Sequence, residues 1–162
     1  MNTEKAFVET IKQNEGLIYK VTAVYGNHAE DKKDLYQEIV LQLWKAFEKF
    51  RNQSQVSTWL YRVALNTAIT RLRKDKKEGQ MVTFDAGIHG LEDSYDPILE
   101  ERSKNLYSHI AMLNDIEKAV VLLYLEDKSH QEIAQITGLT ASNVGTRMAR
   151  IKEKLKKGIT KG

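Results

Sequence analysis

The chain has 162 residues, of which 41% are hydrophobic and 29% charged, and its formal net charge is +3 at pH 7. This composition is typical of a soluble folded chain and excludes a disordered one, and the length suits one ordinary domain or two small ones. The absence of cysteine excludes disulfides and thiolate chemistry.

The first residues lack the basic and apolar segments of a secretory signal peptide. The longest apolar run, residues 119–125, is too short to cross a bilayer. We therefore expect a cytoplasmic protein without membrane insertion.

Apolar spacing predicts helix over residues 3–26, with Gly16 as a break between two segments. Asn27 and Glu30 have the spacing of a capping box and predict the start of a second helix, which should reach about Phe50. Residues 52–54 predict a turn, and a third helix should follow from about Val56 to Lys77.

The second and third predicted helices each combine an apolar face with a polar one. The apolar faces are formed by Val40, Leu43, Trp44 and Phe47 in the second helix, and by Leu60, Val63, Ala64 and Ala68 in the third. The polar faces are formed by Asp34, Glu38, Gln42, Lys45 and Lys49, and by Arg62, Asn66, Thr70, Arg73 and Lys77. An acidic face and a basic face thus follow one another, although periodicity alone is also consistent with two solvated faces of a helical bundle.

Residues 78–96 predict a flexible linker, because glycines interrupt the helical period and basic residues are scarce. Residues 85–101 hold carboxylates and no Lys or Arg, and they lie between two basic blocks, residues 59–77 and 128–162. Two basic blocks of this kind indicate two surfaces that face phosphates. A solvated tether is an equally good interpretation of the acidic segment.

Three helix starts are predicted beyond the linker. Asp96 with Pro97 begins a helix that should reach about Met112. Capping boxes are predicted at Asn114 with Glu117, opening a helix through Leu125, and at Ser129 with Glu132.

Residues 130–157 have the pattern of a helix-turn-helix. Ala134, Gly138 and Val144 take its small-residue, turn and core positions, and Thr140 is a good N-cap for the second helix. In that helix Val144, Met148, Ile151 and Leu155 predict the buried stripe, while Asn143, Arg147, Arg150, Lys154 and Lys157 share the far side. A recognition helix needs this arrangement, with its first turns at base edges and its later cations near phosphates. Apolar spacing alone also permits a helical hairpin for protein contacts.

Nothing in the sequence predicts catalysis. It contains no Gly-rich phosphate loop, nucleophile elbow or metal-ligand cluster, and its histidines are scattered. We therefore expect an all-α protein of two small helical domains, without enzymatic activity, metal or cofactor.

Two parts of the chain resemble the extracytoplasmic-function (ECF) subgroup of bacterial sigma factors. The first resembles region 2 and carries Asp34-Leu35-x-Gln37-Glu38, Leu43-Trp44, Phe50, Ser57-Thr58-Trp59-Leu60-Tyr61-Arg62, Ala64, Asn66, Ala68-Ile69 and Arg73. The second resembles region 4 and carries Leu113, Glu132-Ile133-Ala134, Gly138, Val144, Arg147, Ala149-Arg150 and Lys154-Leu155. Many spaced matches over about forty residues are a specific signal, unlike a lone short motif.

The resemblance implies a sigma factor that binds core RNA polymerase and starts transcription at promoter DNA, often under an anti-sigma factor. It implies a region 2 domain (residues 1–77), a linker (78–96) that threads through the polymerase, and a region 4 domain (97–162). The implied polymerase-binding residues are Asp34, Leu35, Gln37, Glu38 and Gln42. The implied −10 residues are Trp59, Tyr61, Arg62, Asn66, Arg73 and Lys74. The implied −35 residues are Ser142, Asn143, Thr146, Arg147, Arg150 and Lys154.

Two positions depart from the family pattern. Many members have Asp at the position of Thr70, and a polar or basic residue at that of Gly145, so no role is carried over to either. Two other classes of protein stay open. One is a helix-turn-helix regulator with an N-terminal sensor or dimerisation bundle, which would not need the acidic face of Asp34 and Glu38. The other is an anti-sigma-like adaptor, against which the basic recognition face argues.

Overall fold

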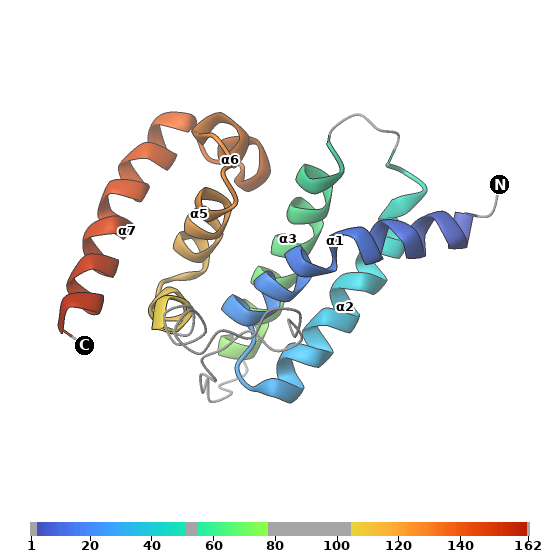
Figure 1. Cartoon of the computed structure of the whole chain (residues 1–162), viewed down its shortest axis with the longest axis horizontal. Coiled ribbons are helices and arrows are strands. Elements are labelled where there is room, and N and C mark those ends of the chain that lie inside the picture. Colours follow the sequence, from blue (N-terminus) through green and yellow to red (C-terminus); the bar gives the residue numbers. More distant parts are fainter. Residues whose placement is uncertain (1–2, 51–54, 78–104, 162) are drawn as a thin grey trace.

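The computed structural model describes residues 3–50, 55–77 and 105–161, and every regular element in these ranges is a helix (Figure 1). The N-terminal half contains α1 (Thr3–Tyr25), α2 (Ala29–Phe47) and α3 (Val56–Lys77), which pack against one another. The C-terminal half contains helical residues 105–111, then α5 (Asp115–Leu125), α6 (His130–Thr137) and α7 (Ala141–Lys161). The predicted all-α fold of two helical domains is confirmed. The predicted turn at 52–54, the linker at 78–96 and the helix start at Asp96 lie outside the described residues.

Helix α1 runs past Gly16 and kinks two residues earlier, at Asn14, where φ is −125° and ψ is 15°. The Asn14 amide donates to the carbonyl of Thr10 at 2.9 Å. A side chain that bonds to the backbone of the preceding turn competes with the helical ladder and bends it. The predicted break at Gly16 is therefore wrong in position.

Helix α2 begins one residue later than predicted. Its N-cap is His28, whose ring nitrogen accepts from the backbone N–H of Asp31, and the backbone N–H of Asn27 donates to the Asp31 carboxylate at 2.8 Å. The capping residues are thus His28 and Asp31, not Asn27 and Glu30. The helix ends at Phe47, three residues before the predicted end, and α3 has the predicted bounds.

The buried side of α2 is formed by Leu35, Ile39 and Leu43. Of the predicted stripe, Leu43 is buried, whereas Trp44 is 39% exposed and contacts Phe7 edge-on with ring centroids 5.0 Å apart. The apolar face is therefore rotated from its predicted position, because α1 and α3 cover the side that contains Leu35.

The caps of the C-terminal half follow the sequence closely. Asn114 and Glu117 form a reciprocal capping box, and the Ser129 hydroxyl accepts from the backbone N–H of Glu132. Gly138 ends α6 with a φ of 83°, a conformation that favours glycine, and Thr140 accepts from the Asn143 backbone N–H at 3.0 Å.

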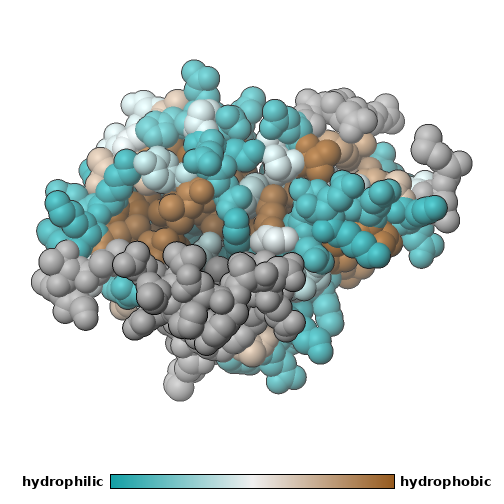
Figure 2. Space-filling model, in the orientation of Figure 1, coloured by the Kyte–Doolittle hydropathy of each residue, from teal (hydrophilic) through white to brown (hydrophobic). Residues whose placement is uncertain are grey.

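Helix α7 packs its stripe of Val144, Met148 and Ile151 against α5 and α6, as predicted. Figure 2 shows apolar surface in separate patches framed by hydrophilic residues. None of the helices that the structure describes is long and apolar enough to cross a membrane.

Candidate nucleic-acid interface

The predicted polymerase-binding residues of α2 differ in accessibility. Asp34 and Gln37 are exposed, and Glu38 and Gln42 are half-buried. Leu35 is 1% exposed and packs in the core, so it is not available as a contact residue. It lies one position from Asp34 on a helix that turns 100° per residue, which carries its side chain toward α1 and α3.

Arg71 on α3 connects the acidic side of α2 to the basic helix. Its guanidinium donates to Asp31 at 2.8 Å and to Glu38 at 3.1 Å. The Glu38 side chain remains 43% exposed. Glu38 therefore contributes to packing between α2 and α3 as well as to the surface, whereas Asp34 stands only on the surface.

Two exposed apolar side chains on α2 were not among the predicted site residues. Leu41 is 49% exposed and Trp44 39%. Leu41 lies seven residues after Asp34, so the two share one helix face. Leu41 therefore borders the polar face predicted from the sequence, as the i, i+7 spacing from Asp34 would have shown.

The basic face of α3 is largely accessible. Arg62, Asn66, Thr70, Arg73 and Lys74 are all exposed. Arg62 and Arg73 nevertheless reach the C-terminal half. Arg62 Nη2 lies 3.4 Å from the carbonyl oxygen of Gln135, and Arg73 Nε donates to the Asp115 carboxylate at 2.6 Å.

The two aromatic residues predicted for the −10 element are core residues in this arrangement. Trp59 is 8% exposed and stacks on Phe50 with ring centroids 4.7 Å apart. Tyr61 is 1% exposed, and no described residue accepts a hydrogen bond from its hydroxyl. Burial and the negative charge of Glu126 raise the pKa of Tyr61 well above its ordinary value. Neither ring presents a face to a DNA base here.

The first turns of α7 contain most of the residues predicted to read the −35 element. Ser142, Asn143, Thr146 and Arg150 are exposed, on the side away from the buried stripe. Arg147 Nε donates to Asn143 Oδ1 at 2.7 Å, which leaves the two terminal guanidinium nitrogens for other partners. The structure therefore brings five of the six predicted −35 residues together at one end of the helix.

Lys154, the sixth predicted −35 residue, has a structural partner. Its ammonium lies 2.7 Å from the Glu117 carboxylate, whose side chain is only 9% exposed. Glu117 also closes the capping box of α5. The sequence did not predict this role for Lys154, because Glu117 lies in another helix.

Gly145, which departs from the family pattern, lies beside the first helix of the helix-turn-helix. A Cβ atom built at Gly145 would lie 3.5 Å from Nδ1 of His130, an ordinary van der Waals distance. The glycine thus leaves room for the His130 ring, and alanine would also fit.

The two halves match two separate family models. Residues 10–78 match Sigma-70 region 2, and residues 103–155 match Sigma-70 region 4. The RNA polymerase sigma factor YlaC of Bacillus subtilis is 30% identical to this chain over 83% of this chain and 81% of YlaC. The chain belongs to the ECF sigma factors.

Other comparisons agree with this membership. The sigma factor SigV of Bacillus subtilis is 28% identical over 98% of this chain and 94% of SigV. The fold is similar to that of the sigma factor RpoE from Bartonella quintana, solved in complex with the anti-sigma factor NepR, with a TM-score of 0.77 and 17% identity over 96% of this chain and 98% of RpoE. It is also similar to CnrH, solved with the cytosolic domain of CnrY, with a TM-score of 0.69 and 18% identity over 97% of this chain and 89% of CnrH. Because both halves match one family, a regulator with an unrelated sensor bundle is not favoured.

Proposed function

We propose that this sigma factor docks on core RNA polymerase through α2, engages the −10 element through α3 and reads the −35 element through the first turns of α7. The observation that carries the proposal is the cluster of Ser142, Asn143, Thr146, Arg147 and Arg150 on the outer side of α7. A recognition helix presents its N-terminal side chains to base edges in this way. The protein acts in the cytoplasm as a non-enzymatic initiation factor, without cofactor or metal.

Within α7, Arg147 reads a base and Asn143 positions it. An arginine recognises guanine through two hydrogen bonds, and a guanidinium held in place loses less entropy on binding. The hydrogen bond from Arg147 Nε to Asn143 supplies this restraint. Arg150 is one turn further on and contacts phosphate, while Lys154 supports Glu117.

On α2, Leu41 forms the apolar centre of the polymerase-binding surface, with Asp34 and Gln37 around it. Such an arrangement, an apolar anchor inside a polar rim, is typical of protein interfaces. Asp34 is a better target for mutation than Glu38, because Glu38 also pairs with Arg71.

Run-off transcription with core polymerase tests the function, using a template that carries the promoter upstream of the protein's own gene. We expect a specific transcript that depends on this protein. Asp34→Lys and Leu41→Asp should abolish pull-down of core polymerase and this transcript while keeping the helical content. Lys33→Glu, an exposed charge reversal on the same helix, is the matched control. Full activity of both Asp34→Lys and Leu41→Asp would exclude α2 as the docking surface.

An anti-sigma factor is a further proposed partner. The support is the fold shared with RpoE and CnrH, which were solved with NepR and with CnrY. Affinity purification of the tagged chain from its own organism, followed by mass spectrometry, should recover such a protein. Recovery of polymerase subunits alone would contradict this partner.

A further inference from the structure

The His130 side chain stands at the edge of the proposed −35 surface. His130 is the first residue of α6, and it is exposed. Its ring lies against α7, because a Cβ atom built at Gly145 would lie 3.5 Å from His130 Nδ1 and 3.6 Å from its Cε1. Two proposed −35 residues, Ser142 and Thr146, are close to Gly145 on the same helix. The ring therefore borders the side chains proposed to read the element.

The imidazole of His130 is available to a ligand. Of its ring atoms, Nδ1 and Cε1 are the two within 4 Å of the Cβ position at Gly145, so Nε2 lies farther from α7. Among residues 3–50, 55–77 and 105–161, no hydrogen bond or ion pair uses the ring. The neighbouring polar groups are satisfied by one another, since the Ser129 hydroxyl accepts from the Glu132 backbone N–H and Lys128 pairs with the Glu132 carboxylate. An imidazole in this position can donate a hydrogen bond outward.

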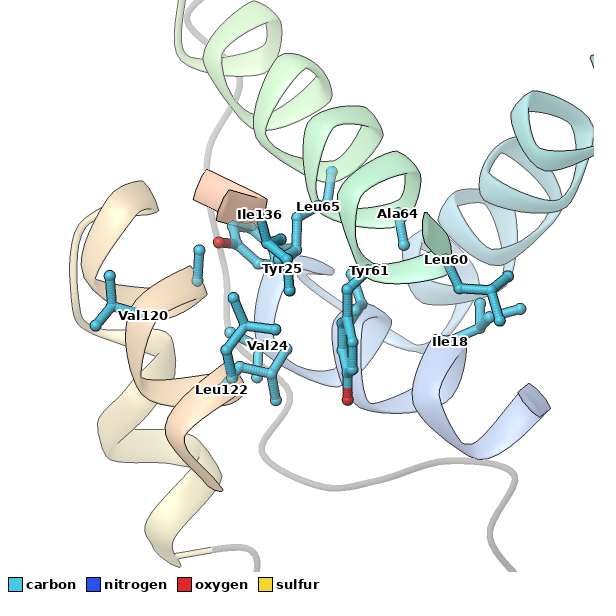
Figure 3. Packing of buried hydrophobic residues seen from close by; sticks show 14 of the residues in the cluster. Ile18, Val24, Tyr25, Leu60, Tyr61, Ala64, Leu65, Val120, Leu122 and Ile136 are labelled. Carbon is cyan, nitrogen blue, oxygen red and sulfur yellow. The ribbon is translucent and has the colours of Figure 1, made fainter. Parts of the chain in front are cut away.

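The core holds α6 in a fixed place beside α7. Ile133 and Ile136 are buried, and Ile136 lies in the same cluster as Leu122 of α5 (Figure 3). The turn to α7 is set by the left-handed Gly138. The His130 ring is thus positioned relative to α7 before DNA arrives, which lowers the entropy lost on binding.

The order of the two helices places this ring near the DNA backbone. In a helix-turn-helix the second helix lies in the major groove, and the first helix crosses the backbone. Here α6 is the first helix and α7 the second. A side chain that projects from the start of α6 and rests on α7 lies at the rim of the groove, where phosphates are. A hydrogen bond from N–H to an anionic phosphate is stronger than one between neutral groups.

We propose that His130 is a DNA-backbone contact of this sigma factor, which donates to one phosphate at the edge of the −35 element, and that Gly145 keeps the space for its ring. The inference rests on the proposed function, because it adds a residue to the same DNA surface. A phosphate contact carries no sequence information but fixes register. His130 therefore sets the position at which Arg147 meets its base.

Two substitutions of His130 separate this contact from simple packing against α7. His130→Phe keeps a ring beside Gly145 and removes the N–H, whereas His130→Gln keeps an N–H donor and removes the ring. Gln135→Ala, at an exposed position of the same helix, is the matched control. Binding of each holoenzyme is measured on promoter DNA with the parent −35 element and with its single-base variants, and circular dichroism verifies folding.

We expect His130→Phe to bind about three- to tenfold more weakly, by the same factor on every −35 variant. His130→Gln and Gln135→Ala should bind within about twofold of the parent. Parent affinity in His130→Phe would overturn the contact. A changed ranking of the base variants in His130→Phe would overturn its assignment to phosphate.

The phosphate itself is located with promoter DNA that carries a neutral methylphosphonate at one backbone position at a time. One position should weaken the parent about three- to tenfold and leave His130→Phe unaffected, because the two changes remove the same contact. If every position weakens the parent and His130→Phe equally, the contact does not exist.

The part assigned to Gly145 is tested in the same assay. Alanine leaves the ring in place, since its Cβ meets His130 at an ordinary distance, whereas the longer side chain of Gly145→Leu competes for the space of the ring. The loss caused by His130→Phe should persist in Gly145→Ala and shrink in Gly145→Leu. An equal loss in both backgrounds would overturn the role of Gly145.

The same data distinguish this inference from the proposed function. A parent holoenzyme that shows no preference among −35 variants would refute the function proposed for α7. A parent that discriminates among them, with unchanged affinity in His130→Phe, would refute the phosphate contact alone.

Discussion

The two proposed DNA surfaces of this sigma factor differ in how ready they are to bind. On the outer side of the first turns of α7 the side chains of Ser142, Asn143 and Thr146 are exposed, and Arg147 is already held by Asn143. On α3 the rings of Trp59 and Tyr61 are buried, and Arg73 is paired with Asp115. A similar basic pattern in the sequence thus gives one surface on α7 whose polar side chains are accessible, and one on α3 whose cations are exposed but whose two aromatic rings are buried.

The largest expected effect separates a core role of Tyr61 from a DNA-binding one. Tyr61→Ala should lower the free energy of unfolding by about 3–5 kcal/mol, because it leaves a cavity among α1, α3 and α5. Tyr61→Phe should keep or raise the stability by up to about 1 kcal/mol, since it removes a buried hydroxyl that lacks a partner. Urea unfolding monitors both variants. A stability of Tyr61→Ala within 1 kcal/mol of the parent would show that the ring is not part of the core.

The second prediction concerns pH and the buried Lys118. Burial, and then the charge of Lys76, lower the pKa of Lys118 to about 8, although Asp115 opposes this shift. A lowered pKa means that the folded state favours the neutral amine of Lys118. The contribution of Lys118 to the stability of the fold is therefore fully present above the ordinary lysine pKa, and it is lost as pH falls through about 8. The other titratable groups around this site are Arg73 and Tyr25. Burial raises the pKa of Tyr25 well above its ordinary value, so its phenol stays neutral.

Between pH 7.5 and 9.5 the free energy of unfolding should therefore gain about 1–3 kcal/mol from Lys118. Lys118→Met should remove this dependence. Lys152, whose ammonium lies 4.7 Å from the Tyr124 ring on the surface, provides the matched control as Lys152→Met. If the pH dependence persists in Lys118→Met and disappears in Lys152→Met, the titrating group is not Lys118.

The third prediction distinguishes base reading from phosphate attraction on α7. Arg147→Ala should remove about 1–3 kcal/mol of discrimination at one base pair of the −35 element. Asn143→Ala should remove part of the same discrimination. Asn143→Asp should retain the discrimination, but this variant should bind all sequences more weakly. Arg150→Ala should weaken all sequences alike and reduce the salt dependence. Holoenzyme binding to single-base variants at several salt concentrations checks this. An altered base ranking in Arg150→Ala but not in Arg147→Ala would require a different docking of α7.

The smallest effect concerns the two glycines of the helix-turn-helix. Gly145→Ala should raise the free energy of unfolding by about 0.5–1 kcal/mol, because alanine has a higher helix propensity than glycine and the new Cβ fits beside His130. Gly138→Ala should lower it, since φ there is 83°. Thermal unfolding measures both. A loss of stability in Gly145→Ala would mean that Gly145 has a structural role that the His130 contact does not explain.

Local features of the fold were predictable from the sequence. The bounds of α3, the caps at Asn114 and Thr140 and the left-handed Gly138 follow from side chains within a few residues, and the structure confirms them. The kink at Asn14 and the N-cap at His28 were missed, because each depends on one side-chain conformation rather than on residue type alone.

Roles that depend on distant contacts were not predictable. Trp59 and Tyr61 have the composition of a base-stacking surface, but their burial depends on Phe50 and on α5. Lys154 was predicted to face phosphate, yet its partner Glu117 lies 37 positions away in the sequence. In contrast, the exposed residues of the first turns of α7 needed only the helical period to be placed on one side.

The central claim is that the exposed cluster on the outer side of α7 reads the −35 element. The most direct measurement is binding of the holoenzyme that carries Arg147→Ala to single-base variants of this element. We predict a loss of about 1–3 kcal/mol of discrimination at one base pair, with the other positions read as in the parent. Unchanged discrimination at every position would contradict the account.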